Sequence, residues 1–213
     1  MEIAVILFLA LILLLPVLYH FAVPLKPPYL DDYFTPGNMI FSESEGIKQI
    51  ILEVRGRNVY SELTLLPQAQ GPPEHMHKYF DESFVVSKGE LTIKLNNEIF
   101  KIPKGNRFKI PRGMYHRIYN ETDKEVTIRP EHETDYVPLE FTYSLAQLYP
   151  LMDSKQGNGL QLLMKLSVLD ELFDSIIKGP HPAVIRVVKK ILKPYARIFG
   201  VTPYDDKSRP TNR

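Results

Sequence analysis

The 213-residue sequence contains no cysteine and no internal repeat. Without cysteine there is no disulfide framework, and this absence alone does not indicate which compartment the protein occupies. The chain also has little net charge, because 26 lysine and arginine residues nearly balance 25 aspartate and glutamate residues. A dedicated nucleic-acid-binding protein usually has a strong basic excess, so we predict no nucleic-acid partner.

The overall composition is that of an ordinary globular chain, with 44% hydrophobic and 24% charged residues. These fractions exclude a disordered, collagen-like or coiled-coil protein, and the length suits one domain with attachments. The charge is nevertheless uneven along the chain. Residues 181–213 contain eight cations against two carboxylates, a net charge of +6, whereas the preceding 180 residues carry −5.

A long apolar run occupies the N-terminus, where Ile3 to Val23 includes only one strongly polar residue, His20. At ~1.5 Å per residue the run reaches ~30 Å, the thickness of a bilayer's hydrocarbon core. The leader has no lysine or arginine and no small-residue cleavage pattern, so an uncleaved anchor fits better than a cleaved signal peptide. We therefore predict a single-pass transmembrane anchor over residues 1–24, in which Pro16 is tolerated. A buried helix of a soluble protein is the alternative.

The side of the membrane that the rest of the chain occupies is weakly determined, because Lys26 is the one cation that closely follows the run. Cations flanking a span set its orientation, and anionic lipid is plentiful on the cytoplasmic leaflet. The basic C-terminal segment therefore favours the cytoplasmic face.

Two segments that differ in composition and hydrophobic pattern follow the anchor. Residues 25–40 are predicted to form a proline-rich linker, because proline fixes φ and cannot donate a backbone hydrogen bond. Over residues 41–142, short β-favouring runs alternate with turn sequences, a pattern typical of an all-β barrel or sandwich. The predicted strands cover residues 47–54, 59–66, 83–86, 91–95, 98–102, 107–110, 115–119 and 125–129.

Residues 143–213 are predicted to be helical, with one segment near residues 160–172 and a second over residues 184–199. The second segment combines an apolar stripe with a basic face. Pro194 is expected to kink this helix or to divide it near Leu192. The helix either lies in the headgroup plane of an anionic membrane or packs on the barrel with its cations facing water, and the pattern suits both arrangements.

The strongest chemical signal lies within the β region. His75 and His77 are two residues apart, a spacing that places both side chains on one face of a strand. Glu82 follows shortly after them, and His116 comes after the turn at residues 111–113. Imidazole and carboxylate groups are ligands for divalent first-row transition metals, so these residues are candidate metal ligands.

These residues resemble the two sequence motifs of the cupin superfamily. In the first motif the leading glycine is displaced to Gly71, which is expected to affect a turn and no ligand. The second motif matches at every position. The matching residues are His75, His77, Glu82 and Gly89 in the first motif, and Gly105, Pro111, Gly113, His116 and Asn120 in the second.

The resemblance covers about residues 40 to 140. It implies a mainly β chain whose cupin-type conical β-barrel, a double-stranded β-helix or jelly roll, lies between the N-terminal transmembrane helix and the C-terminal helical extension. It also implies that His75, His77, Glu82 and His116 bind one metal inside the mouth of the barrel. Because cupins often pair through sheet edges, it further implies a homodimer.

The ligand set favours a transition metal over calcium or magnesium; we favour iron or manganese, with nickel, copper and zinc as alternatives. On an octahedral ion, four protein ligands leave two positions for a substrate or for a substrate and dioxygen. Zinc held tetrahedrally by all four residues would leave no open position and would be structural. Glu82 is also the candidate catalytic residue, because it could leave the metal and act as a base.

Residues that share strand faces with the ligands are candidate pocket walls, by the period of two along a strand: Tyr79, Phe84, Met114 and Ile118. The hydroxyl of Tyr79 could orient a substrate, whereas the aliphatic positions are better explained as barrel core. An apolar wall with few polar groups suits an apolar small molecule.

We therefore predict a membrane-anchored cupin metalloprotein that acts on a small molecule, with a dioxygenase-like oxidoreductase as the favoured reaction class. The resemblance extends equally to cupin isomerases, decarboxylases and lyases, because a fold does not imply a function. The rival prediction is a non-catalytic sensor or binding module, in which the barrel holds a ligand and the helices signal to a partner or to the membrane.

Overall fold

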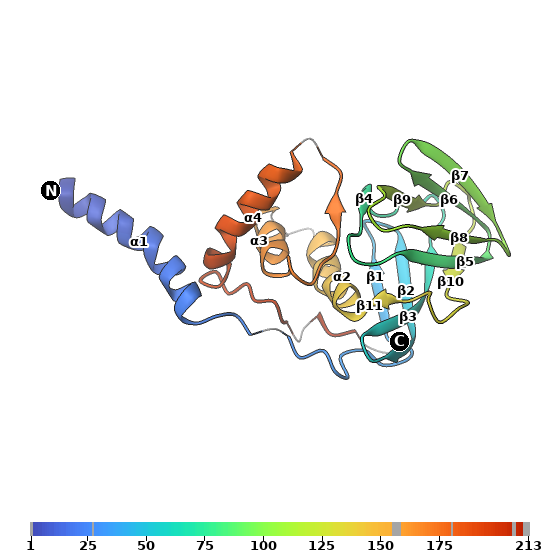
Figure 1. Cartoon of the computed structure of the whole chain (residues 1–213), viewed down its shortest axis with the longest axis horizontal. Coiled ribbons are helices and arrows are strands. Elements are labelled where there is room, and N and C mark those ends of the chain that lie inside the picture. Colours follow the sequence, from blue (N-terminus) through green and yellow to red (C-terminus); the bar gives the residue numbers. More distant parts are fainter. Residues whose placement is uncertain (1, 27, 155–158, 180, 206–207, 211–213) are drawn as a thin grey trace.

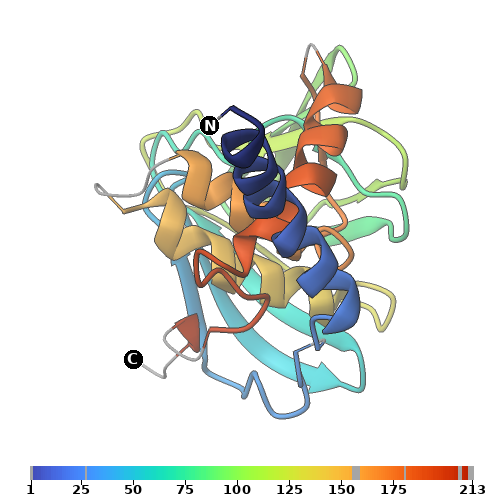
Figure 2. The ribbon, with the colours of Figure 1, turned by 90° about the vertical axis from the view of Figure 1, so that its left-hand side faces the viewer.

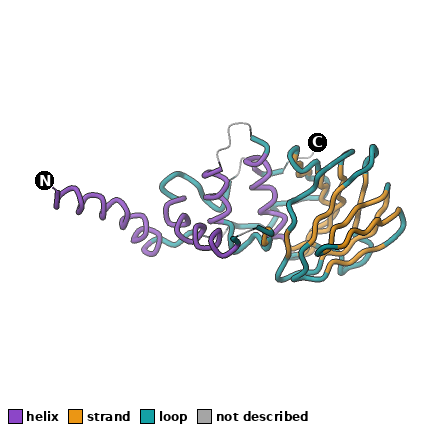
Figure 3. The backbone as a smooth tube through the Cα atoms, turned by 90° about the horizontal axis from the view of Figure 1, so that it is seen from above, coloured by secondary structure: helices purple, strands orange, loops and turns teal. Residues whose placement is uncertain are grey.

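The computed structural model describes residues 2–26, 28–154, 159–179, 181–205 and 208–210. Within these residues, a single helix extends from one end, three helices occupy the middle and the strands occupy the other end (Figures 1 and 3). Pro27 of the predicted linker, and Lys207 and Arg213 of the basic segment, lie outside the described residues.

The strands form two antiparallel sheets, and the prediction of a mainly β fold is confirmed. The first sheet has the order β1 (Met39–Ser42), β2 (Ile47–Arg55), β3 (Asn58–Leu65), β10 (Val126–Arg129), β5 (Glu82–Lys88) and β8 (Arg107–Ile110), with β11 (Val137–Pro138) also paired to β3. The second has the order β12 (Ile176–Ile177), β4 (His75–Met76), β9 (His116–Tyr119), β6 (Glu90–Leu95) and β7 (Glu98–Pro103).

All eight strands expected from the sequence are present, and some of them alternate in burial along the strand. In β2, for example, Ile47, Gln49 and Ile51 are buried and the residues between them are less so. Inward-facing residues of both sheets form one apolar core, to which β5 contributes Val86 and β6 contributes Ile93. Burying each such side chain stabilises the fold by about 1.5–3 kcal/mol.

A second core lies between the first sheet and the helices α2 (Leu139–Met152) and α3 (Gly159–Val168). Tyr143 of α2 is fully buried there. The segment predicted to be a linker also contributes, since Leu30, Tyr33 and Phe34 are buried in the same core. The helical region therefore packs directly on the strands (Figure 1).

The basic segment forms a single helix, α4 (Pro182–Ala196), and the expected division near Leu192 does not occur. Pro194 lies in the last turn of α4, where a missing backbone donor interrupts the helix close to its natural end. Leu192 packs against the second core, while Val184, Ile185 and other apolar residues of α4 remain exposed.

The N-terminal apolar run forms the helix α1 (Glu2–Ala22), as expected, and it continues through Pro16. Almost all of its side chains are exposed, and the helix projects from one end of the molecule (Figure 1), so that in Figure 2, viewed from that end, it lies in front of the rest of the chain. It is long and apolar enough to cross a membrane, and an N-terminal signal sequence would have the same properties.

Candidate metal centre

Three buried histidines converge from neighbouring strands of the second sheet. His75 on β4 lies directly opposite His116 on β9 in the antiparallel register, and His77 follows β4 by one residue. One nitrogen from each of the three rings lies within 4.8 Å of the nitrogens of the other two. The sequence motif therefore identified three side chains that the fold brings into one cluster.

The backbone around the histidines determines which ring nitrogen faces the cluster. Nδ1 of His75 lies 2.8 Å from the carbonyl oxygen of Pro73, and Nδ1 of His116 lies 3.0 Å from that of Met114. Nδ1 of His77 lies 2.5 Å from the carbonyl oxygen of Asp174. A carbonyl oxygen only accepts, so each Nδ1 must donate a proton. In the neutral ring Nε2 then carries a free lone pair, as in a metal-ligating histidine.

Glu82, at the start of β5, brings a carboxylate to this cluster. Its Oε2 lies 2.9 Å from Nε2 of His116 and 3.9 Å from Nε2 of His77. Burial would raise the pKa of Glu82, but contact with His116 and the positive charges of the histidines outweigh it and lower the pKa to about 2. A carboxylate that stays ionised to such low pH is suited to bind a cation and is a poor proton acceptor, which favours the ligand role of Glu82 over the base role.

The histidines respond to burial in the opposite sense. Burial and the neighbouring His116 and His77 lower the pKa of His75 to about 4, and burial lowers the pKa of His77. The pKa of His116 is raised, because the contact with Glu82 outweighs the effect of burial. Two of the three rings are therefore neutral at physiological pH, the state required of a metal ligand.

The residues present fit a divalent transition metal. Nε2 of His116 is buried and has no hydrogen-bond partner of good geometry within the described residues, although Oε2 of Glu82 lies 2.9 Å away. In the neutral tautomer both atoms are acceptors, so a proton or a cation must lie between them or beside them. Three imidazoles and one carboxylate form a donor set that first-row transition metals prefer over calcium or magnesium.

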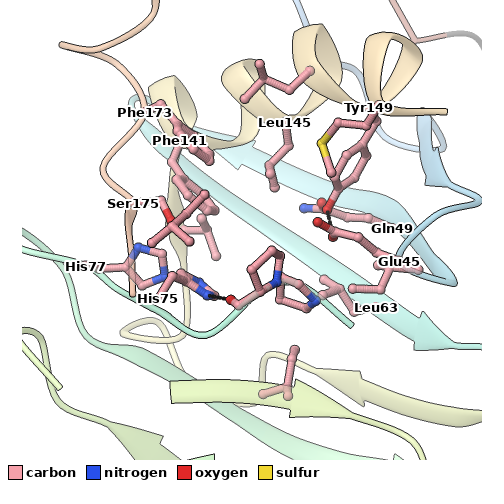
Figure 4. A pocket seen from close by; sticks show the side chains of 18 of the residues that line it. Glu45, Gln49, Leu63, His75, His77, Phe141, Leu145, Tyr149, Phe173 and Ser175 are labelled. Carbon is pink, nitrogen blue, oxygen red and sulfur yellow. Dashed lines mark hydrogen bonds between the residues drawn. The ribbon is translucent and has the colours of Figure 1, made fainter. Parts of the chain in front are cut away.

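The cluster lies at one end of an apolar cavity of about 250 Å³ (Figure 4). One wall comes from barrel residues that include Ile47, Leu63 and Ile118. The opposite wall comes from the helical region, where α2 contributes Leu145 and α3 contributes Leu166. The two walls of the cavity thus come from residues about 100 positions apart in the sequence. The cavity therefore cannot be predicted from the sequence of any one strand or helix.

The four predicted wall residues have different positions. Ile118 lines the cavity, whereas Phe84 is buried in the core between the sheets, and neither Phe84 nor Met114 lines the cavity. Tyr79 is 76% exposed and lies outside it. The predicted alternation does not reach Tyr79, because β4 ends at Met76 and the chain then turns.

Asp174 is a positioning residue that the sequence motifs do not include. Its carboxylate accepts hydrogen bonds from the backbone amides of Lys78 (2.9 Å) and Tyr79 (2.7 Å), and its carbonyl oxygen accepts one from His77. Nearby, β12 pairs with β4, placing Ile177 opposite His75. The C-terminal region therefore completes the sheet that carries the histidines; the domain boundary near residue 142 stays a prediction.

Replacing Asp174 with alanine is expected to lower metal affinity by about 10-fold, the lower end of the range for changes behind a ligating histidine. The substitution removes the carboxylate that holds the amides of Lys78 and Tyr79, so the loop after His77 is less firmly fixed, although the backbone carbonyl of residue 174 still accepts the Nδ1 proton of His77. A chelator-competition titration of the full chain measures the effect. Asp170→Ala is the matched control, because Asp170 pairs with Lys189 on α4. Equal affinities for the two variants would contradict the positioning role.

Comparisons with known proteins identify one similar family and several similar solved structures. Residues 61–128 match the family model of the cupin domain, and no curated protein matches the sequence. Similar solved structures include the Cnp3 cupin domain of Schizosaccharomyces pombe, at 22% identity and a TM-score of 0.37. The match covers 43% of this chain and 64% of that one, so this chain spans less than two thirds of that protein. They also include a sugar phosphate isomerase from Silicibacter pomeroyi, at 19% identity and a TM-score of 0.36 over 48% of this chain and 72% of that one. A third is KdgF from Halomonas sp., at 22% identity and a TM-score of 0.36 over 45% and 90%.

Proposed function

The chain contains a cupin domain, and from this premise we propose that it is a membrane-anchored metalloprotein that oxidises a small apolar molecule with dioxygen. The observation that carries the proposal is the cluster of His75, His77 and His116 beside an apolar cavity, which His75 and His77 line directly. Glu82 is proposed as the fourth ligand of one divalent metal, with iron or manganese favoured over nickel, copper and zinc.

The residues of the site have separable roles. A bound iron or manganese ion would supply the open coordination positions and the redox chemistry. Backbone carbonyls accept the Nδ1 protons of the three histidines and so hold each ring in a fixed orientation with Nε2 toward the cluster. Glu82 supplies the negative charge, while Phe141 and Phe173 stack beside the site and exclude water from it.

The cavity lining indicates the class of molecule. None of the described lining residues is lysine or arginine, and most are aliphatic or aromatic. An anionic substrate such as a sugar phosphate would lose its hydration there, and apart from the proposed metal it would gain no cationic partner. A neutral, largely apolar molecule fits the cavity better. Oxidation by dioxygen does not require charged groups on the substrate, of the kind that sugar phosphates carry.

Metal analysis of the full chain purified without oxygen tests this proposal directly. We expect one transition metal per chain and oxygen uptake that neutral apolar compounds stimulate. A barrel that contains no metal but retains an apolar ligand would instead support the non-catalytic sensor. A metal-loaded protein that takes up no oxygen but converts such compounds would point to an isomerase, decarboxylase or lyase.

The proposal includes seating on a membrane through α1 and α4. In the structure the two helices contact each other, since the hydroxyl of Tyr195 donates to the carbonyl oxygen of Leu13 at 2.9 Å and Arg197 lies over the ring of Tyr19. Because Leu13 lies near the middle of α1, the contact with Tyr195 would have to open for α1 to span a bilayer and α4 to lie in the headgroup plane. The outer side of α4 exposes apolar residues beside cations. Arg186 and Lys190 form no ion pair within the described residues. Lys189 and Lys193 pair with two carboxylates that follow α3, those of Asp170 and Glu171.

Hydrogen exchange in lipid nanodiscs tests this arrangement. We expect the amides of residues 184–191 to exchange more slowly in anionic nanodiscs than in zwitterionic ones, because each cation near an anionic surface contributes about 1 kcal/mol. The protection is expected to decrease at high salt, and the amides of β2 serve as the internal control. Identical exchange in both lipids would show that α4 only packs on α3.

A homodimer is part of the proposal as well. Within the described residues, β1 and β8 end the strand path of the first sheet, and β7 ends the second. Terminal strands have unpaired backbone groups, and a second copy can pair with them.

A further inference from the structure

The cavity has a second polar end, distant from the histidines. Figure 4 shows Glu45, Gln49 and Tyr149 grouped on one side of the pocket and His75 and His77 on the other. Apolar side chains, including Leu63 and Leu145, lie between the two groups. The cavity therefore has an apolar middle and two polar ends of different chemistry.

Contacts from three parts of the chain hold Glu45 at this end. The carboxylate of Asp153, at the C-terminus of α2, accepts hydrogen bonds from the backbone amides of Glu43 (2.8 Å) and Ser44 (2.9 Å). The amide of Gly71 donates to the carbonyl oxygen of Glu45 at 3.0 Å. The hydroxyl of Tyr149 donates to Oε2 of Glu45 at 3.0 Å. The side chain is therefore pre-organised before any ligand arrives.

The free atoms at this end are acceptors. Glu45 is only 7% exposed, and its Oε1 accepts no hydrogen bond within the described residues. Gln49 donates from Nε2 to the hydroxyl of Ser61 at 2.8 Å, and its own oxygen has no donor in the same part of the chain. Because burying an acceptor without a donor is costly, a ligand that supplies a donor would gain free energy here.

The electrostatic environment of Glu45 also favours a ligand that donates a hydrogen bond. Burial, together with the charge of Asp153, raises the pKa of Glu45 to about 7 against the opposing hydrogen bond from Tyr149. A substantial fraction of the carboxyl is therefore ionised at neutral pH, and no lysine or arginine among the described lining residues balances it. Hydrogen bonds to an ionised acceptor are about twice as strong as neutral ones.

We propose that Glu45 and Gln49 form a subsite for a hydrogen-bond donor, a hydroxyl or an amine, at the end of the ligand farthest from the metal centre. The inference rests on the proposed function and narrows it: the substrate is an apolar molecule that approaches the metal at one end and carries a hydroxyl or amine at the other. Tyr149 orients the carboxyl, and the apolar middle of the cavity accommodates the body of the molecule.

Two probes with the same ring system test the subsite: naphthalene and 2-naphthol, titrated into the full chain in detergent. We expect wild-type protein to prefer 2-naphthol by about 10-fold, the value of one hydrogen bond to a charged or polar acceptor. The quantity compared is the ratio of the wild-type preference to that of Glu45→Leu, which is expected to be about fivefold or more. Partition of the probes into micelles, and any binding of the naphthol oxygen to the metal, contributes equally to both preferences and cancels in this ratio.

Two further variants make the result decisive. Glu43→Gln is the matched control in the same loop, with an exposed side chain, and is expected to keep the wild-type preference. If Glu45→Leu fails to fold, Glu45→Gln tests the same point, because an uncharged acceptor is expected to reduce the preference to about threefold. An unchanged preference in whichever folded Glu45 variant is measured would overturn the subsite.

Metal content is measured on the same samples, so the two proposals can fail separately. Normal metal content with a preference independent of Glu45 would refute the subsite alone. A preference that depends on Glu45 in protein without metal would refute the metalloenzyme and support a binding module with this subsite.

Discussion

Replacing His116 with alanine is expected to abolish high-affinity metal binding. His116 is 1% exposed, contacts Glu82 and lies opposite His75, so no neighbouring side chain can take its place. The loss should exceed the about 10- to 100-fold that a change behind a ligand typically causes. The backbone pairing of β4 and β9 does not depend on the imidazole, so the fold should persist. Chelator competition measures the affinity, and circular dichroism checks the fold.

His77→Ala is expected to behave in the same way, whereas His132→Ala is the matched control because His132 is largely exposed and remote from the cavity. Oxygen uptake should disappear together with the metal in the first two variants. Turnover that continues after the metal is lost would contradict the proposed function. Unchanged metal content in His116→Ala would contradict the proposed ligand set itself.

Replacing Gly71 with alanine is expected to destabilise the protein by about 3–5 kcal/mol, among the largest effects of single substitutions. Gly71 has φ +66°, a conformation that costs an L-residue about 1–2 kcal/mol. An added Cβ would also lie 1.9 Å from the carbonyl oxygen of Ile118, so the loop or β9 must move. The change would disturb the strand that carries His116 and the backbone bond to Glu45.

Urea unfolding of the full chain in detergent measures this effect as a lower midpoint at an unchanged slope. Gly56→Ala is the control, because Gly56 also has a positive φ (+58°) but no atom within 4 Å of the added Cβ. We expect it to cost only about 1 kcal/mol. Equal midpoints for the two variants would show that the loop moves freely and that the close approach to Ile118 does not matter.

Gly71 also shows what a motif leaves out. The displaced glycine was expected to affect a turn and no ligand, and the structure adds that its backbone lies against Ile118, two residues from His116. The sequence places Gly71 four residues before His75, but not beside β9, which follows more than forty residues later. Such contacts depend on how the two sheets close.

Local patterns predicted most, but not all, of the longer elements. The eight expected strands follow from β-favouring runs between turn sequences and α1 from a continuous apolar run, whereas β1 and α2 were not predicted as separate elements. β4 and β12 have two residues each, and two residues show no period. Pro194 was expected to divide α4, but its place in the last turn made it tolerable. Tyr79 was predicted on a strand that ends before reaching it.

The sequence by itself determined the mainly β architecture, the apolar N-terminal helix and the cluster of three histidines, because motif spacing and period are local properties of the chain. The tertiary structure alone decided which groups surround the histidines. Asp174 holds the His77 loop from 97 residues away, and Tyr149 meets Glu45 from 104 residues away. These pairs form only when the C-terminal helices cover the barrel, since burying their apolar faces against the strands brings the polar groups together.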